Sequence, residues 1–410
     1  MTHFFSTDRI AFGVGIEDTF IPQEQVGHRK LDEYELTQHY HYWREDLNLA
    51  REAGAEFIRW GIPWFQVEPA PGEFDFSWID EVAAHMQDIG LHCVVDLLHY
   101  GTPLWLDNTF VNAKYPEYFA RYAGAVAERY RGVFTSFTPA NEPLVNAQWC
   151  GRDGRWPPYL TGEDGYVKVV TAVAEGMSRA QEAIHAAAPE AEIVFVDAGF
   201  RYAGDHFPGH SREHLEEWRF VATDLVLGRV SEEHSLFGHL REHGISAEKL
   251  AWFRDNAKTP DIMGVNYYPG FSTTTFDEAG AEVPGEGGVE GLVDLVRVNH
   301  ERYGIPIAIT ETSRNESPEA KIQWLQESLA ALEELRSDGV PITGYTWFPF
   351  FSLIDWLYRY DTDSADNHWN HLGLLELRRT AGGVLERVPN AALRLFTHAV
   401  MASASAAQTT

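Results

Sequence analysis

The sequence has few cysteines, no long apolar run and no internal repeat. Its 410 residues include two cysteines, Cys93 and Cys150, which excludes a disulfide framework and offers no metal-ligand spacing. Cys93 lies within an apolar run, so we expect a small buried side chain there. No uninterrupted apolar run approaches roughly 18 residues, which argues against a membrane-spanning helix. The absence of a repeat of roughly 20 to 50 residues excludes solenoids and propellers.

Basic residues are also scarce. Lys and Arg number 32 against 61 Asp and Glu, which gives a formal net charge of −29. Such a charge repels nucleic acid and anionic membranes and favours a neutral or cationic ligand. A solvated acidic surface without any steering role accounts for the same charge. Residues 1–9 lack a basic region followed by an apolar stretch, so we expect a cytoplasmic protein without a secretory signal.

Eight short apolar runs alternate with helical patterns along the chain. The runs are Ile10–Ile16, Phe57–Trp60, His92–Leu98, Phe134–Ala140, Ile193–Ala198, Ile262–Asn266, Ile307–Thr310 and Ile342–Trp347. Nearly continuous hydrophobicity is typical of parallel strands that are covered on both faces. The helical patterns between them are Tyr42–Ala53, Ile79–Ile89, Tyr118–Tyr130, Tyr166–Ala188 and Pro318–Arg336. This alternation predicts either a closed (β/α)8 barrel or an open doubly wound sheet.

Polar side chains at the strand ends decide between these two folds. They are Arg59, His99, Asn141, Glu142, Asn266, Tyr268, Glu311 and Trp347. In a barrel all of them point to one mouth, whereas an open sheet would add a glycine-rich phosphate loop after the first strand. The segment around Gly13 and Gly15 is not convincing as such a loop. We therefore predict a single (β/α)8 TIM barrel over residues 1–410, because no linker suggests a second domain.

Two glutamates form the strongest chemical signal. Glu142 follows a strand within Thr138-Pro139-Ala140-Asn141-Glu142-Pro143, and Glu311 ends the apolar run that starts at Ile307. Either residue alone could be an ordinary strand terminus. As a pair they suit glycosidic bond cleavage, which needs one carboxylic acid at the leaving oxygen and a second carboxylate across the sugar ring. The fourth and seventh strands face each other across a barrel mouth, so we expect a short separation of roughly 5 Å, which implies retention.

Several ordered motifs resemble glycoside hydrolase family 1, the β-glucosidase family of clan A. Residues 138–143, TPANEP, resemble its acid/base signature, and residues 308–311, AITE, resemble its nucleophile signature, although Thr312 and Ser313 replace Asn and Gly. Further similar stretches are residues 39–46 (HYHYWRED), 57–64 (FIRWGIPW), His99 with Pro103, 264–268 (GVNYY) and 344–355 (GYTWFPFFSLID). The resemblance spans about the tenth to the 375th residue.

The resemblance implies a role for each matching position. Glu142 is implied as acid/base, with a pKa raised by burial and by Glu311, which is implied as the nucleophile. The remaining implied contacts to substrate or to these two glutamates are Arg59 and Tyr268 at Glu311, Asn141 at the sugar 2-hydroxyl, His99 at glycone hydroxyls, Trp347 under the sugar ring, and Asn266, Asp355 and Trp356 nearby. Simpler interpretations stay open: a buried ion pair for Arg59, and core packing for His99 and Trp347.

Two departures from the family pattern lie in the region that is expected to bind the glycone. Glu17 stands where the family has a first-strand Gln, and Asp355-Trp356 follows Ser352-Leu353-Ile354 where the family has a late Glu-Trp pair. The cleaving residues are kept, whereas the glycone-binding region is remodelled, so the sugar is open. Pro69–Asp80 also resembles clan A relatives such as family 42 β-galactosidases and family 5 glycanases.

The sequence therefore predicts a retaining β-glycosidase, β-glucosidase-like, that acts on a small-molecule or oligosaccharide β-glycoside. A β-galactosidase or a diglycoside- or chain-cleaving glycanase is the alternative, and a non-catalytic carbohydrate-binding relative is a more remote one. The single Arg359 amid Asp361, Asp363 and Asp366 argues against a phosphosugar pocket. We expect no metal and no organic cofactor, no nucleic-acid or membrane partner, and a possible homo-oligomer.

Overall fold

Eight parallel strands close into a barrel at the centre of the molecule. The computed structural model describes residues 3–205, 207, 209 and 211–407. The barrel strands are β1 (Ala11–Gly15), β4 (Phe57–Gly61), β5 (His92–Asp96), β6 (Ser136–Thr138), β7 (Glu192–Ala198), β9 (Ile262–Asn266), β12 (Ile307–Thr312) and β13 (Ile342–Trp347). Each strand pairs with its neighbours in chain order, and β13 pairs with β1 to close the ring. The predicted (β/α)8 fold and all eight predicted strands are confirmed.

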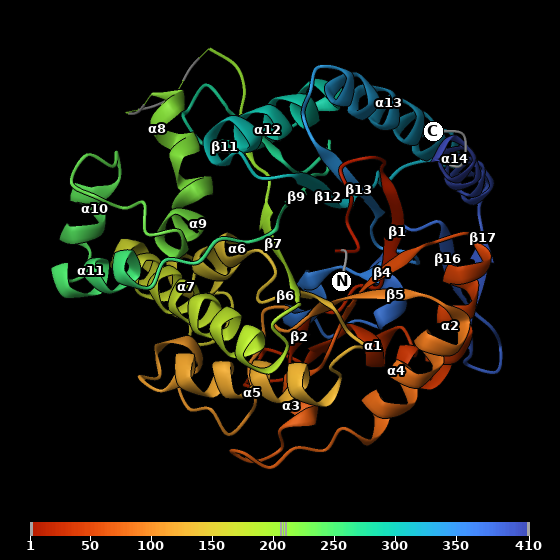
Figure 1. Ribbon diagram of the computed structural model, residues 1–410, viewed down its shortest axis with the longest axis horizontal. Coiled ribbons are helices and arrows are strands. Elements are labelled where there is room, and N and C mark those ends of the chain that lie inside the picture. Colours follow the sequence, from red (N-terminus) through yellow and green to blue (C-terminus); the bar gives the residue numbers. More distant parts are fainter. Residues whose placement is uncertain (1–2, 206, 208, 210, 408–410) are drawn as a thin grey trace.

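Helices surround the barrel and cover its outer face (Figure 1). The longer ones are α2 (His39–Glu52), α4 (Ser77–Ile89), α5 (Tyr115–Arg129), α7 (Gly162–Ala187), α12 (Gly288–Tyr303), α13 (Pro318–Ser337) and α14 (Ala391–Ala407). The five predicted helices correspond to α2, α4, α5, α7 and α13. The strands read as continuous apolar runs because the helices bury one face and the barrel interior buries the other.

Side chains fill the interior of the barrel near its N-terminal end. Phe5 and Phe57 pack edge to face there, with ring centroids 5.1 Å apart. Val94 and Ala308 belong to the same buried cluster. A Cβ atom on Gly13 would lie 2.4 Å from the Phe57 ring, so glycine is needed at that point of the first strand. The barrel is therefore a packed core, and a ligand has access only at the opposite end.

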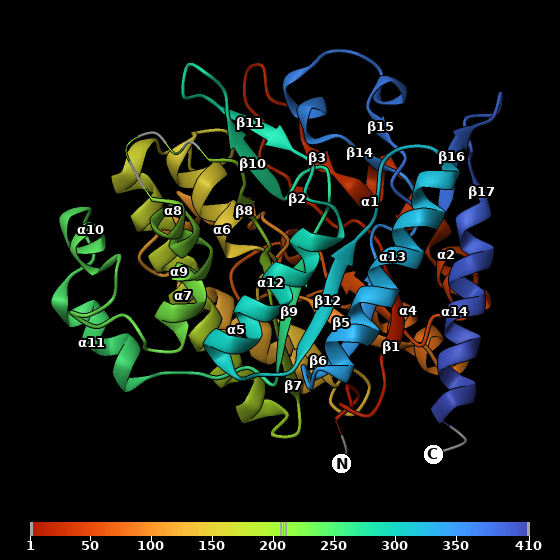
Figure 2. The same cartoon turned by 90° about the horizontal axis from the view of Figure 1, so that it is seen from above.

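Short accessory elements stand over the C-terminal ends of the strands (Figure 2). They are the pair β2 (Phe20–Ile21) and β3 (Leu31–Asp32), the helix α1 (Glu33–Leu36), the sheet of β8 (Arg201–Tyr202), β10 (Thr273–Phe276) and β11 (Glu282–Gly285), and the pair β14 (Leu353–Ile354) and β15 (Trp369–Asn370). The β10–β11 hairpin and β15 lie in stretches that the sequence marks only as irregular loops. These elements build the walls around the barrel mouth.

The shorter helices fill the stretch between β7 and β9. They are α8 (Arg212–Glu217), α9 (Val221–Val226), α10 (Phe237–Glu242) and α11 (Ala247–Asp255). Among the described residues, no helix is both long and apolar enough to cross a lipid bilayer.

Candidate active site

Glu142 leaves the fourth barrel strand in a left-handed backbone conformation. Its φ is 42°, a region that costs a non-glycine residue about 1–3 kcal/mol. Its N–H donates to Val196 O at 3.1 Å, and Pro143 begins the short helix α6 (Pro143–Asn146) directly afterwards. In an extended strand Asn141 and Glu142 would point to opposite faces. The left-handed turn lets both side chains face the barrel mouth.

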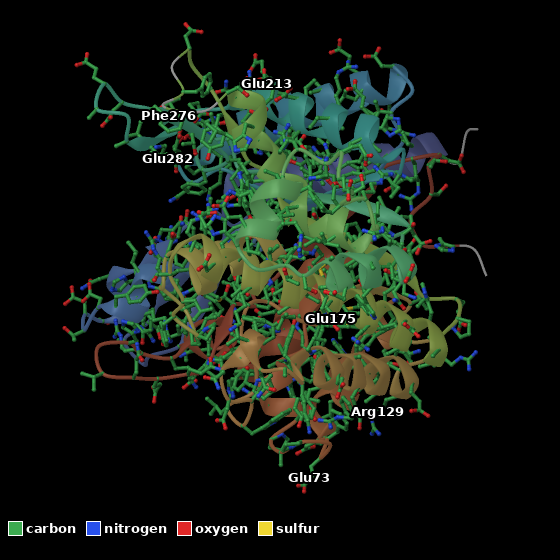
Figure 3. All side chains as sticks on the ribbon, turned by 90° about the vertical axis from the view of Figure 1, so that its left-hand side faces the viewer. Glu73, Arg129, Glu175, Glu213, Phe276 and Glu282 are labelled. Atoms are coloured by element: carbon green, nitrogen blue, oxygen red, sulfur yellow. The ribbon has the colours of Figure 1, made fainter. Side chains whose placement is uncertain are left out.

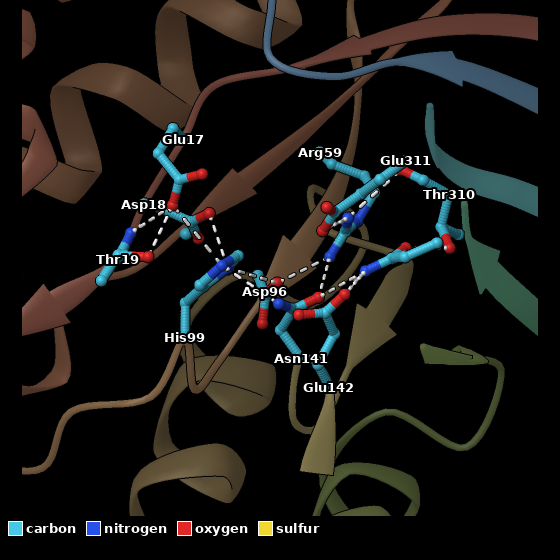
Figure 4. Close-up of polar contacts among 12 residues, drawn as sticks. Glu17, Asp18, Thr19, Arg59, Asp96, His99, Asn141, Glu142, Thr310 and Glu311 are labelled. Carbon is cyan, nitrogen blue, oxygen red and sulfur yellow. Dashed lines mark hydrogen bonds and ion pairs between the residues drawn. The ribbon is translucent and has the colours of Figure 1, made fainter. Parts of the chain in front are cut away.

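A break in strand register directs the side chain of Glu311 to the barrel mouth. The pairing of β12 with both of its neighbours becomes irregular after Ile309. Thr310 Oγ1 donates to Asn266 Oδ1 at 2.7 Å inside the mouth, and the next residue, Glu311, also directs its carboxylate there (Figure 4). Such irregularities re-aim side chains near functional sites.

Both carboxylate oxygens of Glu142 accept hydrogen bonds. Asn266 Nδ2 donates to Oε1 at 2.9 Å, and the Tyr100 hydroxyl donates to Oε2. Burial raises the pKa of Glu142 to about 7, and repulsion from Glu311 adds to the shift. A substantial fraction of the molecules therefore carry a proton on Glu142 at neutral pH, as a general acid requires.

Both carboxylate oxygens of Glu311 also accept hydrogen bonds, but one of the two donors is charged. Arg59 donates through NH1 to Oε1 at 2.7 Å, and the Tyr268 hydroxyl donates to Oε2 at 2.6 Å. The Arg59 and Glu311 side chains are almost fully buried. A buried guanidinium stabilises negative charge on this carboxylate. Burial, followed by the charge of Glu311, raises the pKa of Tyr268 well above its usual value, so its hydroxyl keeps its proton.

One amide connects the two carboxyl groups. Asn141 Oδ1 accepts from Arg59 NH2 at 3.0 Å and from Asn266 Nδ2 at 3.3 Å. Those donors are the same groups that bind Glu311 and Glu142 respectively. The two glutamates, far apart in the sequence, thus belong to a single buried network that sets their relative position (Figure 4).

His99 lies at the other end of this network, among carboxyl groups. Its Nδ1 is 2.8 Å from Asp18 Oδ1, and its Nε2 is 3.6 Å from Glu17 Oε1 and 3.0 Å from Asn141 Nδ2. Burial opposes protonation, but the charge of Asp18 and the hydrogen bond to it prevail and hold the pKa of His99 well above its usual value. The neighbouring carboxyl groups therefore favour the protonated form of His99.

Glu17, Asp18 and His99 also have the geometry of a metal-ligand group. One ligand atom from each lies within 4.8 Å of the others, and the trio is the only such group among the described residues. The donors are already engaged, because His99 Nδ1 contacts Asp18 at 2.8 Å and Glu17 Oε1 accepts from the N–H and the hydroxyl of Thr19. An ion pair therefore accounts for the trio without a metal ion.

Trp347, predicted as the floor under the sugar, has a different environment. Its indole N–H donates to Leu372 O at 3.2 Å, and its side chain is completely buried in the large hydrophobic core. The neighbouring Phe348 stacks parallel to His99 with centroids 6.4 Å apart, and its ring lies 5.5 Å from the Arg59 guanidinium. The aromatic ring that faces the site is therefore that of Phe348, one residue further along.

Asp355 and Trp356 lie outside the polar network. Asp355 Oδ1 accepts from Leu357 N at 2.8 Å and caps a short 3₁₀ helix, so it stabilises the loop. Trp356 packs edge to face against Tyr100 and Trp156, with centroids 5.4 and 5.0 Å away. Trp356 thus packs against Tyr100, which binds Glu142, whereas the hydrogen bond of Asp355 Oδ1 stays within its own loop.

Three polar residues of the network are absent from the sequence prediction. Tyr100 follows His99 in a left-handed conformation with φ of 78°, and its hydroxyl oxygen accepts from Asn141 Nδ2 at 3.0 Å. Asp96, at the end of β5, accepts from Arg59 NH2 at 2.8 Å. Asp18 directly follows Glu17. The strand-end rule that identified His99 could have found Asp96, but nothing in the sequence marks the backbone turn that directs Tyr100 to Glu142.

A cavity of about 580 Å³ lies among the segments that follow β6, β7 and β9, and the two glutamates are not among its lining residues. Leu144, two residues after Glu142, lines it, as does Phe271, whose ring lies 6.1 Å from that of Tyr268. The other aromatic walls are Tyr166, Phe200, Tyr202 and Trp218, and Arg152, Glu163 and Glu282 add charge. Figure 3 shows Glu282 and Phe276 together on the β10–β11 hairpin, near Glu213 and far from Glu73 and Arg129.

Comparisons with known proteins agree with this geometry. Residues 11–288 match the model of glycosyl hydrolase family 1, a stretch that includes Glu142 and ends before Glu311. The chain is 25% identical to a β-glucosidase of Agrobacterium sp. (strain ATCC 21400) over 78% of each chain. It is 21% identical to the 6-phospho-β-glucosidase AscB of Escherichia coli K12, over 84% of this chain and 81% of the relative.

A solved structure extends the likeness to the whole fold. The family 1 β-glucosidase from Thermotoga maritima superposes with a TM-score of 0.81 at 16% identity, and the match covers 97% of this chain and 98% of the other. The family match, the closed barrel and the two buried glutamates at its mouth lead to one assignment: this chain belongs to glycosyl hydrolase family 1 and is a glycoside hydrolase.

Proposed function

We propose that the protein is a retaining β-glycosidase that removes a β-linked, unphosphorylated glycone through a covalent intermediate on Glu311. The observation that carries this proposal is the unequal support of the two carboxyl groups. Glu142 accepts from neutral donors only and has a pKa raised to about 7, whereas Glu311 accepts from the guanidinium of Arg59. One carboxyl group is thereby prepared to give up a proton and the other to attack.

In the first step Glu142 donates its proton to the glycosidic oxygen while Glu311 attacks the anomeric carbon. The bond to the leaving group breaks and a glycosyl ester with Glu311 forms. In this mechanism Arg59 and Tyr268 remain beside the ester oxygen atoms, and Asn141 binds the 2-hydroxyl. In the second step Glu142, now a carboxylate, takes a proton from water, and that water displaces Glu311 with a second inversion.

The leaving group fits the cavity that begins at Leu144 and Phe271. Its volume of about 580 Å³ and its aromatic walls suit a sugar or an aryl group. This space supports the cleavage of disaccharides or larger aglycones as well as small aryl glycosides. A chain-cleaving glycanase stays the alternative function, because the cavity is wide enough for more than one sugar.

The glycone is proposed to carry no phosphate. The region around His99 holds the carboxyl groups of Glu17 and Asp18, which repel an anion. Arg359, the nearest candidate for a phosphate ligand in the sequence, is fully buried and donates to Arg29 O and to the Tyr159 hydroxyl. Although some relatives are named as 6-phospho-β-glucosidases, this chain offers no free cation among these residues.

A panel of nitrophenyl glycosides tests the proposal. It contains β-glucoside, β-galactoside, β-fucoside, the β-glucoside 6-phosphate, a β-linked disaccharide glycoside and the α-glucoside. We expect cleavage of at least one neutral β-glycoside, and a kcat/KM at least about 100-fold lower for the 6-phosphate, because like charges at close range cost several kcal/mol. A preference for the 6-phosphate or for the α-glycoside would contradict the proposal.

A further inference from the structure

Glu33 is a buried carboxyl group that the proposed reaction does not use. It is the first residue of α1 and has no exposed surface. Its N–H donates to Thr19 O at 3.2 Å, and its Oε2 accepts from Ile354 N at 3.1 Å in the loop after the eighth barrel strand. Its other oxygen, Oε1, has no hydrogen-bond partner among the described residues. Glu33 thus links two walls of the mouth and keeps one acceptor free.

The free oxygen belongs to the same end of the site as Glu17 and His99. After burial, the charge of Glu17 is the largest cause that raises the pKa of Glu33, and the charge of His99 acts in the opposite direction. Glu17 in turn interacts electrostatically with Glu311. Thr19 joins Glu33 to Glu17 directly, because its carbonyl oxygen accepts from Glu33 N while its N–H and hydroxyl donate to Glu17 Oε1.

A purely structural role explains only one of the two carboxyl oxygens of Glu33, the one that accepts from Ile354 N. An acceptor for Ile354 N could be an amide or a hydroxyl, and neither would bring a second carboxyl group next to Glu17. A buried carboxyl oxygen without a partner costs folding free energy. Polar atoms of this kind are uncommon in folded proteins and call for a compensating partner. A hydroxyl group of a bound sugar would be such a partner.

We propose that Glu33 is a specificity residue whose Oε1 accepts a hydrogen bond from a glycone hydroxyl remote from the anomeric carbon, beside the hydroxyls that Glu17 and His99 bind. This inference rests on the proposed β-glycosidase function. The substrate class it names is a pyranoside with a free hydroxyl at C3, C4 or C6. Removal of that hydroxyl leaves the buried carboxyl group unpaired, so the site discriminates strongly against the deoxy sugar.

The variant Glu33→Gln tests the contact with little change in volume. Ile354 N requires an acceptor, so the amide oxygen takes the place of Oε2 and the NH2 group replaces the free acceptor with a donor. We expect kcat/KM for the preferred nitrophenyl β-glycoside to fall about 10-fold, within the usual range for the loss of one buried hydrogen bond. The same variant should lose less than about 3-fold on one of the 3-, 4- and 6-deoxy analogues, because that contact is already absent there.

Glu192→Gln is the matched control. Glu192 is also a buried carboxyl group, but it lies at the start of β7 and accepts from Ser136 Oγ at 2.8 Å and Phe5 N at 3.3 Å, at the opposite end of the barrel. Its substitution should leave the ratio of rates on parent and deoxy glycosides unchanged. Thermal unfolding of each variant reports whether it folds, and Glu33→Asp, which withdraws the carboxylate by one methylene, gives a second variant for the same comparison.

The outcomes separate the two proposals. If the wild-type protein cleaves no β-glycoside, the proposed function fails. If the wild type is active but Glu33→Gln and Glu33→Asp lose the same factor on the parent and on all three deoxy analogues, or lose nothing, the specificity role of Glu33 is overturned and the function stands. A loss that disappears on a single deoxy analogue supports the role and identifies the hydroxyl.

Discussion

The glutamates at the two ends of the active site differ in how completely their carboxyl oxygens are paired. At the cleaving end, all four carboxylate oxygens of Glu142 and Glu311 accept a hydrogen bond from another side chain. At the opposite end, Glu33 Oε1 and Asp18 Oδ2 have no partner among the described residues. The two glutamates of the cleaving end are thus held by donors of the protein itself, whereas Glu33 keeps an oxygen that no described residue pairs.

This contrast separates catalysis from selection of the sugar. A preorganised group lowers the barrier without reorganisation during the reaction, so changes there should lower turnover on every substrate. Changes at the unpaired end should instead depend on which hydroxyl the substrate carries. The following predictions are ordered by the size of the expected effect and address one end or the other.

Glu311→Ala should have the largest effect. We expect kcat to fall on the order of 10⁴-fold or more, the size of loss seen when a hydrolase loses its nucleophile. Added azide or formate should restore turnover and give an α-glycosyl product, because the small anion occupies the space of the carboxylate and undergoes one inversion. Lack of rescue, or a β-configured azide product, would count against this residue as nucleophile.

Glu142→Ala should affect substrates according to their leaving group. For a poor leaving group, which needs protonation, we expect a loss of about 10²- to 10⁴-fold, the usual range for general acid catalysis. For a dinitrophenyl leaving group the first step should be nearly unaffected. A series of aryl glycosides of graded leaving-group pKa measures this, and equal losses across the series would refute the acid role.

Tyr100→Phe should change the pH profile more than the rate. The Tyr100 hydrogen bond favours the ionised form of Glu142, so its loss should raise the pKa of Glu142 above about 7. Activity depends on protonated Glu142 and falls as pH rises through that pKa. The basic limb of kcat/KM should therefore move to higher pH, with about a 10-fold lower maximum. Tyr268→Phe, which acts on Glu311, is the control that should leave the limb in place.

Glu33→Gln should have a small effect on stability that grows with pH. Burial and the charge of Glu17 raise the pKa of Glu33 in the folded protein. A raised pKa favours folding below the unfolded value near 4.5, and this contribution is lost as pH rises toward the folded value. The variant does not titrate, so its Tm relative to that of the wild type should rise as the pH is raised from 5. The exposed Glu319→Gln should show no such trend, and a constant Tm difference in Glu33→Gln would contradict the buried charge.

The barrel could be predicted from the sequence because the pattern of an apolar strand occurs eight times. Each apolar strand is buried on both faces, and each helix is long enough to show its period. The accessory elements over the mouth were not predictable, because strands of two residues such as β2 and β14 carry no pattern of their own. Their position follows from contacts with the barrel, as in the bond between Ile354 N and Glu33.

The site was predictable where a motif ends a strand. The two glutamates lie together with Arg59, Asn141, His99 and Glu17 (Figure 4), and Asn266 and Tyr268 donate to them, whereas the roles of these residues toward a substrate stay predictions. Tyr100 was missed because a left-handed backbone conformation directs it to Glu142. Trp347 as the floor under the sugar stays a prediction, and the ring stacked with His99 belongs to Phe348. The single domain, the oligomeric state and the cellular location stay predictions.

The configuration of the first product tests the central claim most directly. Proton NMR during hydrolysis of a rapidly cleaved β-glycoside resolves the released anomers before mutarotation. Two displacements, one by Glu311 and one by water, predict that the β-anomer appears first and the α-anomer grows in only later. Initial release of the α-anomer would mean a single displacement by water, and the assignment of Glu311 as a covalent nucleophile would be wrong.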